Sequence, residues 1–236
     1  MIKTSLFAIS LLALTSLSSA APAEVLFDGK SLDAFEFREG GWVIEDGVMT
    51  CRMEEKTDKK GNKRMAGMGY IWTKKDYSDF ALTLSYKLSE AANSGVFYRT
   101  DPGNPVHGGF EIQLMDNEGY AKKRGAEMPG KKSNGAFYEG KAASSNPANP
   151  VGEWNKMKLT CRGPKIKVEL NGKEIVSVNV NDWYTAGRNP DGTKNKFKTA
   201  LKDLPRIGRI GFQNHGQVVW FKDVKIRELS KGRKKK

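Results

Sequence analysis

The chain of 236 residues has little cysteine and little histidine, with two of each. Two cysteines alone cannot form a cysteine zinc site. Cys51 and Cys161 would each point to the apolar face of a strand, and both a disulfide and two buried free thiols agree with the sequence. The chain also lacks a G-x-S-x-G elbow, a P-loop, an H-E-x-x-H motif and a Rossmann fingerprint, so none of the hydrolase or nucleotide-binding classes that these motifs mark is supported.

Long apolar runs are missing after the first residues. Nothing downstream of residue 20 approaches the roughly 18 consecutive apolar residues of a membrane helix, so we expect no membrane span. The N-terminus itself has a positive start at Lys3, an apolar run over 6–17 and small residues up to Ala20. This layout predicts a secretory signal peptide over residues 1–20 and a periplasmic or secreted protein.

Acidic residues are fewer than basic ones: 27 Asp and Glu stand against 40 Lys and Arg, for a formal charge of +13. Part of the excess lies in a basic C-terminal tail at 230–236, and part is spread through loops at 56–64 and 122–132. A basic surface favours an anionic partner only where the cations cluster. We therefore expect a solvated tail and no specific nucleic-acid partner, with polyanion binding by the tail as an alternative.

Period-two alternation of apolar and polar residues recurs along the rest of the chain. It is clear over 81–88 and 165–170, and it predicts strands with one buried and one solvated face. Asp46-Gly47 and Asn171-Gly172 stand between such segments and favour two-residue hairpin turns. Turn signals between many short strands predict an all-β fold, a two-sheet antiparallel sandwich.

Helical periodicity is weak, and we find neither an internal repeat nor a second domain, so one domain is expected over 25–229. Two long irregular stretches, 117–150 and 183–205, interrupt the strand pattern. Loops of that length in a compact domain tend to be functional or disordered.

The richest cluster of polar residues follows the strand predicted at 81–88. Glu111 and Gln113 are two residues apart in a predicted strand, so they share one face at a Cα separation of roughly 6 to 7 Å. Arg99 on a neighbouring strand would add a cation and complete a sugar-binding cluster. A solvated sheet face with an ordinary Arg and Glu pair is the alternative reading.

His215 stands beside a glycine at the end of a predicted strand and is a candidate acid or base, or else an ordinary surface histidine. Oxygen ligands for Ca²⁺ could come from Asp101, Asp116, Asn117 and Glu118, although their spacing matches no EF-hand. The metal requirement and the oligomeric state stay open at this point.

Eight short motifs, taken in order over about residues 25–229, resemble the 3-keto-disaccharide hydrolase family, whose fold is a concanavalin A-like jelly-roll sandwich of the lectin and glucanase type. In order they are 26–32 (LFDGKSL), 42–47 (WVIEDG), 93–99 (NSGVFYR), 111–117 (EIQLMDN), 134–138 (NGAFY), 152–155 (GEWN), 189–193 (NPDGT) and 211–216 (GFQNHG).

The resemblance implies cleavage of mono- or disaccharide glycosides whose C3 hydroxyl has been oxidised to a ketone. Such a ketone acidifies the C2 proton, so a base can remove it, the C1 substituent can leave by β-elimination, and water can add back. On this chain the resemblance makes His215 the base or acid and Glu111 its carboxylate counterpart, with Arg99 and Gln113 at the ketone or enolate oxygen.

The same resemblance assigns substrate hydroxyls to Asn93 and Asp116, and a wall for the sugar to Tyr138 or Trp42. Because a fold does not determine function, a non-catalytic carbohydrate-binding module of the same fold is the second reading. Such a module would stack sugars on Trp42, Tyr138 and Trp154.

Overall fold

The computed structural model describes residues 22–230 and consists almost entirely of antiparallel strands, as the alternation predicts. The predicted signal peptide and most of the basic tail fall outside these residues. The larger sheet runs in the order β13 (Lys173–Asn179), β12 (Lys165–Leu170), β11 (Asn155–Arg162), β8 (Phe80–Leu88), β15 (Val219–Glu228), β4 (Val48–Cys51) and β3 (Trp42–Glu45), with β1 (Glu24–Phe27) also paired to β15.

A second sheet packs against the first. Its order is β10 (Phe110–Met115), β9 (Asn93–Thr100), β14 (Arg209–Phe212), β7 (Ile71–Thr73) and β2 (Phe35–Phe37). A separate hairpin is formed by β5 (Met53–Thr57) and β6 (Lys63–Gly67). This arrangement confirms the predicted two-sheet sandwich.

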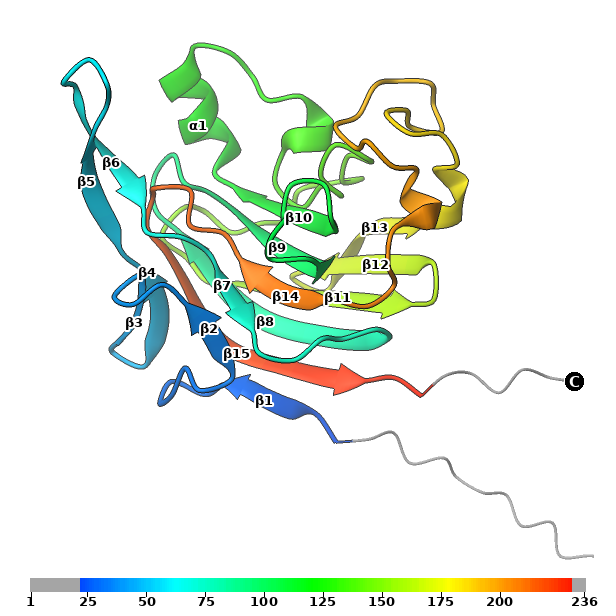
Figure 1. Ribbon diagram of the computed structural model, residues 1–236, viewed down its shortest axis with the longest axis horizontal. Coiled ribbons are helices and arrows are strands. Elements are labelled where there is room, and N and C mark those ends of the chain that lie inside the picture. Colours follow the sequence, from blue (N-terminus) through cyan, green and yellow to red (C-terminus); the bar gives the residue numbers. More distant parts are fainter. Residues whose placement is uncertain (1–21, 231–236) are drawn as a thin grey trace, which may run out of the picture.

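Helical segments are short. They are α1 (Asn117–Arg124) and the 3₁₀ turns η1 (Gly130–Lys132), η2 (Val180–Asp182) and η3 (Leu201–Asp203). In Figure 1 the β5–β6 hairpin, α1 and the segment after β13 lie along one side of the molecule, while β1 and β15 lie along the opposite side. No helix within the described residues is long and apolar enough to cross a membrane.

The hydrophobic core lies between the two sheets because each strand turns alternate residues inward. Leu82 and Leu84 of β8 and Ile112 and Leu114 of β10 are fully or almost fully buried in it. Removal of such side chains from water supplies most of the stabilisation, at about 25 cal/mol per Å² of apolar surface.

Both predicted hairpin turns are present. Asp46 and Gly47 join β3 to β4 with φ of 49° and 74°, and Asn171 and Gly172 join β12 to β13 with φ of 48° and 83°. These positive φ values are the ones that asparagine, aspartate and glycine tolerate best.

The two cysteines are unpaired and buried. Cys51 lies on β4 and Cys161 on β11, and β8 and β15 stand between these strands in one sheet. Three interstrand spacings separate them by about 14 Å, twice the Cα distance that a disulfide allows.

Candidate active site on the outer face of the five-stranded sheet

The outer face of the five-stranded sheet carries polar side chains where its inner face is apolar. On β10, Glu111 and Gln113 point outward, while Phe110 and Ile112 belong to the core between the sheets. On the neighbouring strand β9, Phe97 lies opposite Glu111, and Gly95 lies opposite Gln113. Strand alternation thus brings Glu111 and Gln113 to one face, as their spacing predicts.

The carboxylate of Glu111 lies over the backbone of Gly95. A Cβ added at Gly95 would come within 2.4 Å of Glu111 Oε1 and 3.0 Å of its Cγ. Any larger residue at this position would displace the carboxylate. Gly95 thereby fixes where the Glu111 carboxylate sits on the sheet.

Lys196 supplies a cation to this carboxylate. Its Nζ lies 3.4 Å from Glu111 Oε2, and the side chains are 17% and 6% exposed. Burial raises the pKa of Glu111 above 4.5, although the nearby ammonium opposes that rise. Burial likewise lowers the pKa of Lys196, against the effect of Glu111. In both residues the loss of solvent outweighs the pairing, and such shifted groups are typical of sites that transfer protons.

Two tyrosines stand beside the pair. Lys196 Nζ lies 4.4 Å from the ring centroid of Tyr138. Burial, reinforced by the charge of Glu111, raises the pKa of Tyr138 to about 12. Burial also raises the pKa of Tyr70, where Gln213 Nε2 donates a hydrogen bond of 3.1 Å to the phenol oxygen. Both phenols therefore keep their protons at neutral pH.

Amides and aromatic rings form the rest of the surface. Gln113 Nε2 donates to Asn93 Oδ1 at 3.0 Å, and both side chains are buried. The ring of Phe97 stacks on Tyr70 with centroids 5.4 Å apart, and it also contacts Trp72 at 5.6 Å. Apolar rings with a few convergent polar groups are the usual lining of a small-molecule site.

Asn189 ties together the two segments that bring Tyr138 and Lys196 to the sheet. Its Nδ2 donates to the Glu139 carbonyl at 2.9 Å, and its Oδ1 accepts from the Trp183 indole at 2.8 Å. Asn189 is the first residue of the motif at 189–193, and the contacts of its buried side chain explain why an amide is needed there. A carboxylate at Asn189 could not donate to the Glu139 carbonyl.

Arg99 does not join the cluster, which corrects the expectation from strand pairing. Its φ is +49°, and the pairing of β9 with β14 shifts register at this point. The bulge turns the guanidinium away from Glu111. The Arg99 side chain is fully buried. Its guanidinium donates to the Ser78 and Gly163 carbonyls at 2.8 and 2.7 Å and lies 3.1 Å from Asp79 Oδ1.

Trp42 and Asp116 also lie elsewhere than predicted. Trp42 is 2% exposed, packs on Phe221 and donates its indole N–H to the Gly69 carbonyl, so it cannot form a wall for a sugar. Asp116 is the N-cap of α1, where its carboxylate accepts from the backbone N–H of Gly119 and of Ala91. The helix itself was not predicted, although aspartate three residues before a backbone donor is a usual cap.

His215 follows β14, two residues beyond Gln213, and is exposed. The preceding residue, Asn214, packs against Gly67 at the end of β6. Partial desolvation lowers the pKa of His215 below its usual 6.5, so the ring is mostly neutral at pH 7. No hydrogen bond within residues 22–230 joins it to Glu111.

The candidate calcium ligands are partly engaged. The Asn117 side-chain oxygen accepts from the Asn134 N–H, and Asp101 accepts from the Gly103 N–H. The part of the chain that the structure describes contains no group of three or more histidine, cysteine, aspartate or glutamate residues placed to hold a metal ion.

Sequence reasoning missed Tyr70 and Lys196. Tyr70 and Trp72 are two residues apart, a spacing that could have placed both rings on the face of β7 that points away from the core. Lys196 has no such signal, because it reaches the sheet from a long loop whose course depends on the buried contacts of Asn189.

A jelly-roll sandwich with polar and aromatic side chains gathered on one sheet face is the architecture of carbohydrate-active proteins, and this chain has it. It belongs to the 3-keto-alpha-glucoside-1,2-lyase-like domain family, whose model matches residues 22–227. A 3-keto-disaccharide hydrolase of Bacteroides thetaiotaomicron is 24% identical over 231 residues, covering 86% of this chain and 77% of the relative.

Solved structures agree with this placement. A putative glycosyl hydrolase from Parabacteroides distasonis superposes with a TM-score of 0.76 at 30% identity, covering 89% of this chain and all of that one. The catalytic domain of an endo-1,3-beta-glucanase from Thermotoga petrophila has a TM-score of 0.51 at 10% identity, covering 89% of this chain and 99% of the other, and shows the shared fold alone.

Proposed function

We propose that the protein is an exported enzyme that cleaves 3-keto-glycosides, including 3-keto-disaccharides, by β-elimination followed by hydration. The observation that carries the proposal is the Glu111 carboxylate, held over Gly95 and buried beside Lys196 and two tyrosines. The family and the name of the Bacteroides relative support the substrate class.

A ketone at C3 changes what the enzyme must supply. It acidifies the C2 proton, so the glycosidic bond can break without the usual pair of glycosidase carboxylates. The site then needs a base for C2, a positive or hydrogen-bonding partner for the enolate oxygen, and an acid for the leaving oxygen at C1.

The cluster provides these groups. Glu111 takes the C2 proton, and its raised pKa makes the carboxylate a stronger base than an exposed one. Lys196 and the amide of Gln113 stabilise the enolate oxygen, a role that Arg99 cannot have from its position. Tyr138, protonated at neutral pH, gives its proton to the leaving oxygen, and a C1=C2 double bond conjugated to the ketone results.

Hydration reverses the electron flow. Neutral His215 accepts a proton from water as the water oxygen bonds to C1. The Glu111 acid proton exchanges with solvent while the leaving sugar departs; Glu111 then protonates C2, and the proton held by His215 restores the Tyr138 phenol. The net reaction consumes one water and leaves each side chain as it began. Asn93 and Gln213 hold ring hydroxyls through their amides.

Incubation of the mature protein with a 3-keto-disaccharide, followed by chromatography of the products, tests the proposal. We expect release of two monosaccharides, one of them a 3-keto sugar, and no cleavage of the same disaccharide with an unoxidised C3. Binding of the 3-keto-disaccharide without any product across pH 5 to 9 would contradict an enzyme and favour the carbohydrate-binding module.

A further inference from the structure

The outer face of the eight-stranded sheet, on the other side of the sandwich from Glu111, is strongly basic. Strand alternation turns lysine and arginine outward on four neighbouring strands, and we call this surface the basic face. Its cations are Lys87 on β8, Lys156, Lys158 and Arg162 on β11, Lys165 and Lys167 on β12, and Lys222, Lys225 and Arg227 on β15.

Strand register arranges these cations in two facing rows. Lys156 of β11 and Lys222 of β15 both stand opposite Ser85 of β8. One step along, Lys158 and Lys225 both stand opposite Thr83. The short hydroxyl side chains between the lysines leave a groove with a volume of about 320 Å³, which also contains Glu169 and Asp223.

Carboxylates neutralise only part of the basic face. Lys158 pairs with Glu169 at 2.7 Å and Lys167 with Glu174 at 2.9 Å. The other cations have no ion pair within residues 22–230. Arg162 even stands directly opposite Lys165. Like charges in cross-strand pairs destabilise a sheet, so the stability of the fold does not account for this face.

Two tryptophans at one end hold lysines in place. Lys222 Nζ lies 4.3 Å from the ring centroid of Trp154, and Lys87 Nζ lies 4.5 Å from that of Trp220. These cation–π contacts limit the motion of the side chains before any ligand binds. In each contact the ammonium covers one face of the indole, a face on which an unpaired nucleobase could otherwise stack.

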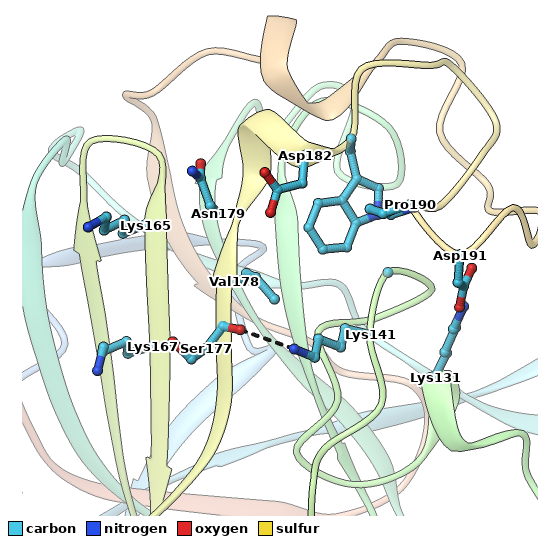
Figure 2. Close-up of a pocket in the computed structure, with 12 residues that line it drawn as sticks. Lys131, Lys141, Lys165, Lys167, Ser177, Val178, Asn179, Asp182, Pro190 and Asp191 are labelled. Carbon is cyan, nitrogen blue, oxygen red and sulfur yellow. Dashed lines mark hydrogen bonds and ion pairs between the residues drawn. The ribbon is translucent and has the colours of Figure 1, made fainter.

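The basic face continues around the edge of the sheet. Figure 2 shows Lys165 and Lys167 of β12 beside a cavity of about 510 Å³, with Ser177 and Asn179 of β13 on its wall. Lys141 enters from the segment between η1 and β11 and donates to the Ser177 carbonyl at 3.2 Å. Figure 2 shows Asp182 near Asn179 and Asp191 on the side of the cavity away from Lys165, where Asp191 is paired with Lys131.

We propose that the basic face binds a single chain of an acidic polysaccharide, with carboxylates as in a polyuronate, and so anchors the protein to acidic glycan. The facing rows of cations match a linear polyanion, and the serine and threonine floor offers hydrogen bonds to sugar hydroxyls. Single-stranded nucleic acid relies on base stacking as well as charge, and lysines already cover one face of Trp154 and one of Trp220 here. Among the described residues, Val25 of β1, opposite Lys225, is the exposed large apolar side chain on a strand of this sheet, and one such side chain is too little apolar surface to insert into a membrane.

The test compares two triple variants of the mature protein for binding to polygalacturonate at several salt concentrations. The first is Lys156→Ser, Lys222→Ser and Lys225→Ser on the basic face. The matched control is Lys59→Ser, Lys60→Ser and Lys123→Ser, three exposed lysines outside it. We expect the first variant to bind on the order of tenfold more weakly at low salt, with a shallower salt dependence, and the control to lose less than about twofold.

Equal loss in the two variants would overturn the proposal. So would full retention by the first variant together with loss on deletion of residues 231–236, or tighter binding to a single-stranded oligonucleotide or to phosphatidylserine vesicles than to polygalacturonate. The proposal does not depend on the proposed reaction. Polygalacturonate binding by a protein that cleaves no 3-keto-glycoside would support it unchanged.

Discussion

Replacement of Gly95 by alanine perturbs the site at a single point. The new Cβ would stand 2.4 Å from Glu111 Oε1, whereas ordinary contact begins near 3.4 Å. The carboxylate must therefore move by about 1 Å. The φ of Gly95 is negative or extended, so alanine fits the backbone of β9 without strain there.

We expect a displacement of that size to lower kcat/KM for a 3-keto-disaccharide by about 10²-fold, because the reacting atoms lose their alignment. The change crowds a buried side chain and should cost about 1 to 3 kcal/mol of unfolding free energy, which leaves the protein folded at 25 °C. Steady-state kinetics and urea unfolding measure the two effects separately.

Gly130→Ala is the matched control, because its Cβ would meet only Ala142, at 3.2 Å, outside the site. We expect full activity from this control. If folded Gly95→Ala keeps the wild-type kcat/KM, then the position of the Glu111 carboxylate does not govern the reaction, and the reasoning fails.

The remaining predictions concern the same pair of charges and two buried elements. Glu111→Gln should lower kcat/KM by about 10²-fold or more. The wild-type activity should fall with decreasing pH through a pKa above 4.5, and an acid limb at or below 4.5 would count against Glu111 as the base. Lys196→Met removes the charge that opposes the rise of the Glu111 pKa, so the acid limb of the pH–rate profile should move to higher pH. An unmoved limb would show that the charge of Lys196 does not influence the group that titrates there. Arg99→Met should reduce the unfolding free energy, measured by chemical denaturation, by about 3 to 5 kcal/mol, because the buried guanidinium stabilises the fold. The folded variant should keep its kcat, and a loss of kcat without a loss of stability would show that Arg99 acts in the active site. Reductant should leave the melting temperature unchanged because Cys51 and Cys161 are unpaired, and a drop on reduction would show a disulfide.

Local sequence signals were enough for the fold. Asp46-Gly47 and Asn171-Gly172 fix their hairpins through backbone preferences of two residues, and period-two alternation assigns each strand an inner and an outer face. The placement of Glu111 and Gln113 on one face follows from the same alternation.

The prediction was wrong where a strand departs from regular geometry. The bulge at Arg99 turns a side chain that simple alternation would place beside Glu111. The family resemblance gave Trp42, as an alternative to Tyr138, as a wall for the sugar, yet its strand lies in the other sheet and its ring is in the core. Neither the bulge nor the sheet that holds a strand can be inferred from spacing.

Long-range contacts account for what the sequence did not show. Lys196 reaches Glu111 because Asn189 and its partners fix the loop; the Asn189–Glu139 contact joins residues 50 positions apart, and the Lys196–Glu111 contact joins residues 85 positions apart. The basic face was also hidden: the cations are scattered along the sequence and gather only when β8, β11, β12 and β15 pair.

The central claim is that the glycosidic bond breaks after removal of the C2 proton. The most direct measurement is proton NMR of the reaction of a 3-keto-disaccharide in D₂O, with an enzyme-free sample as the control for spontaneous exchange. The account predicts that the released 3-keto sugar carries deuterium at C2 and that Glu111→Gln abolishes this incorporation. A product that keeps its C2 proton would show direct displacement at C1 and would contradict the account.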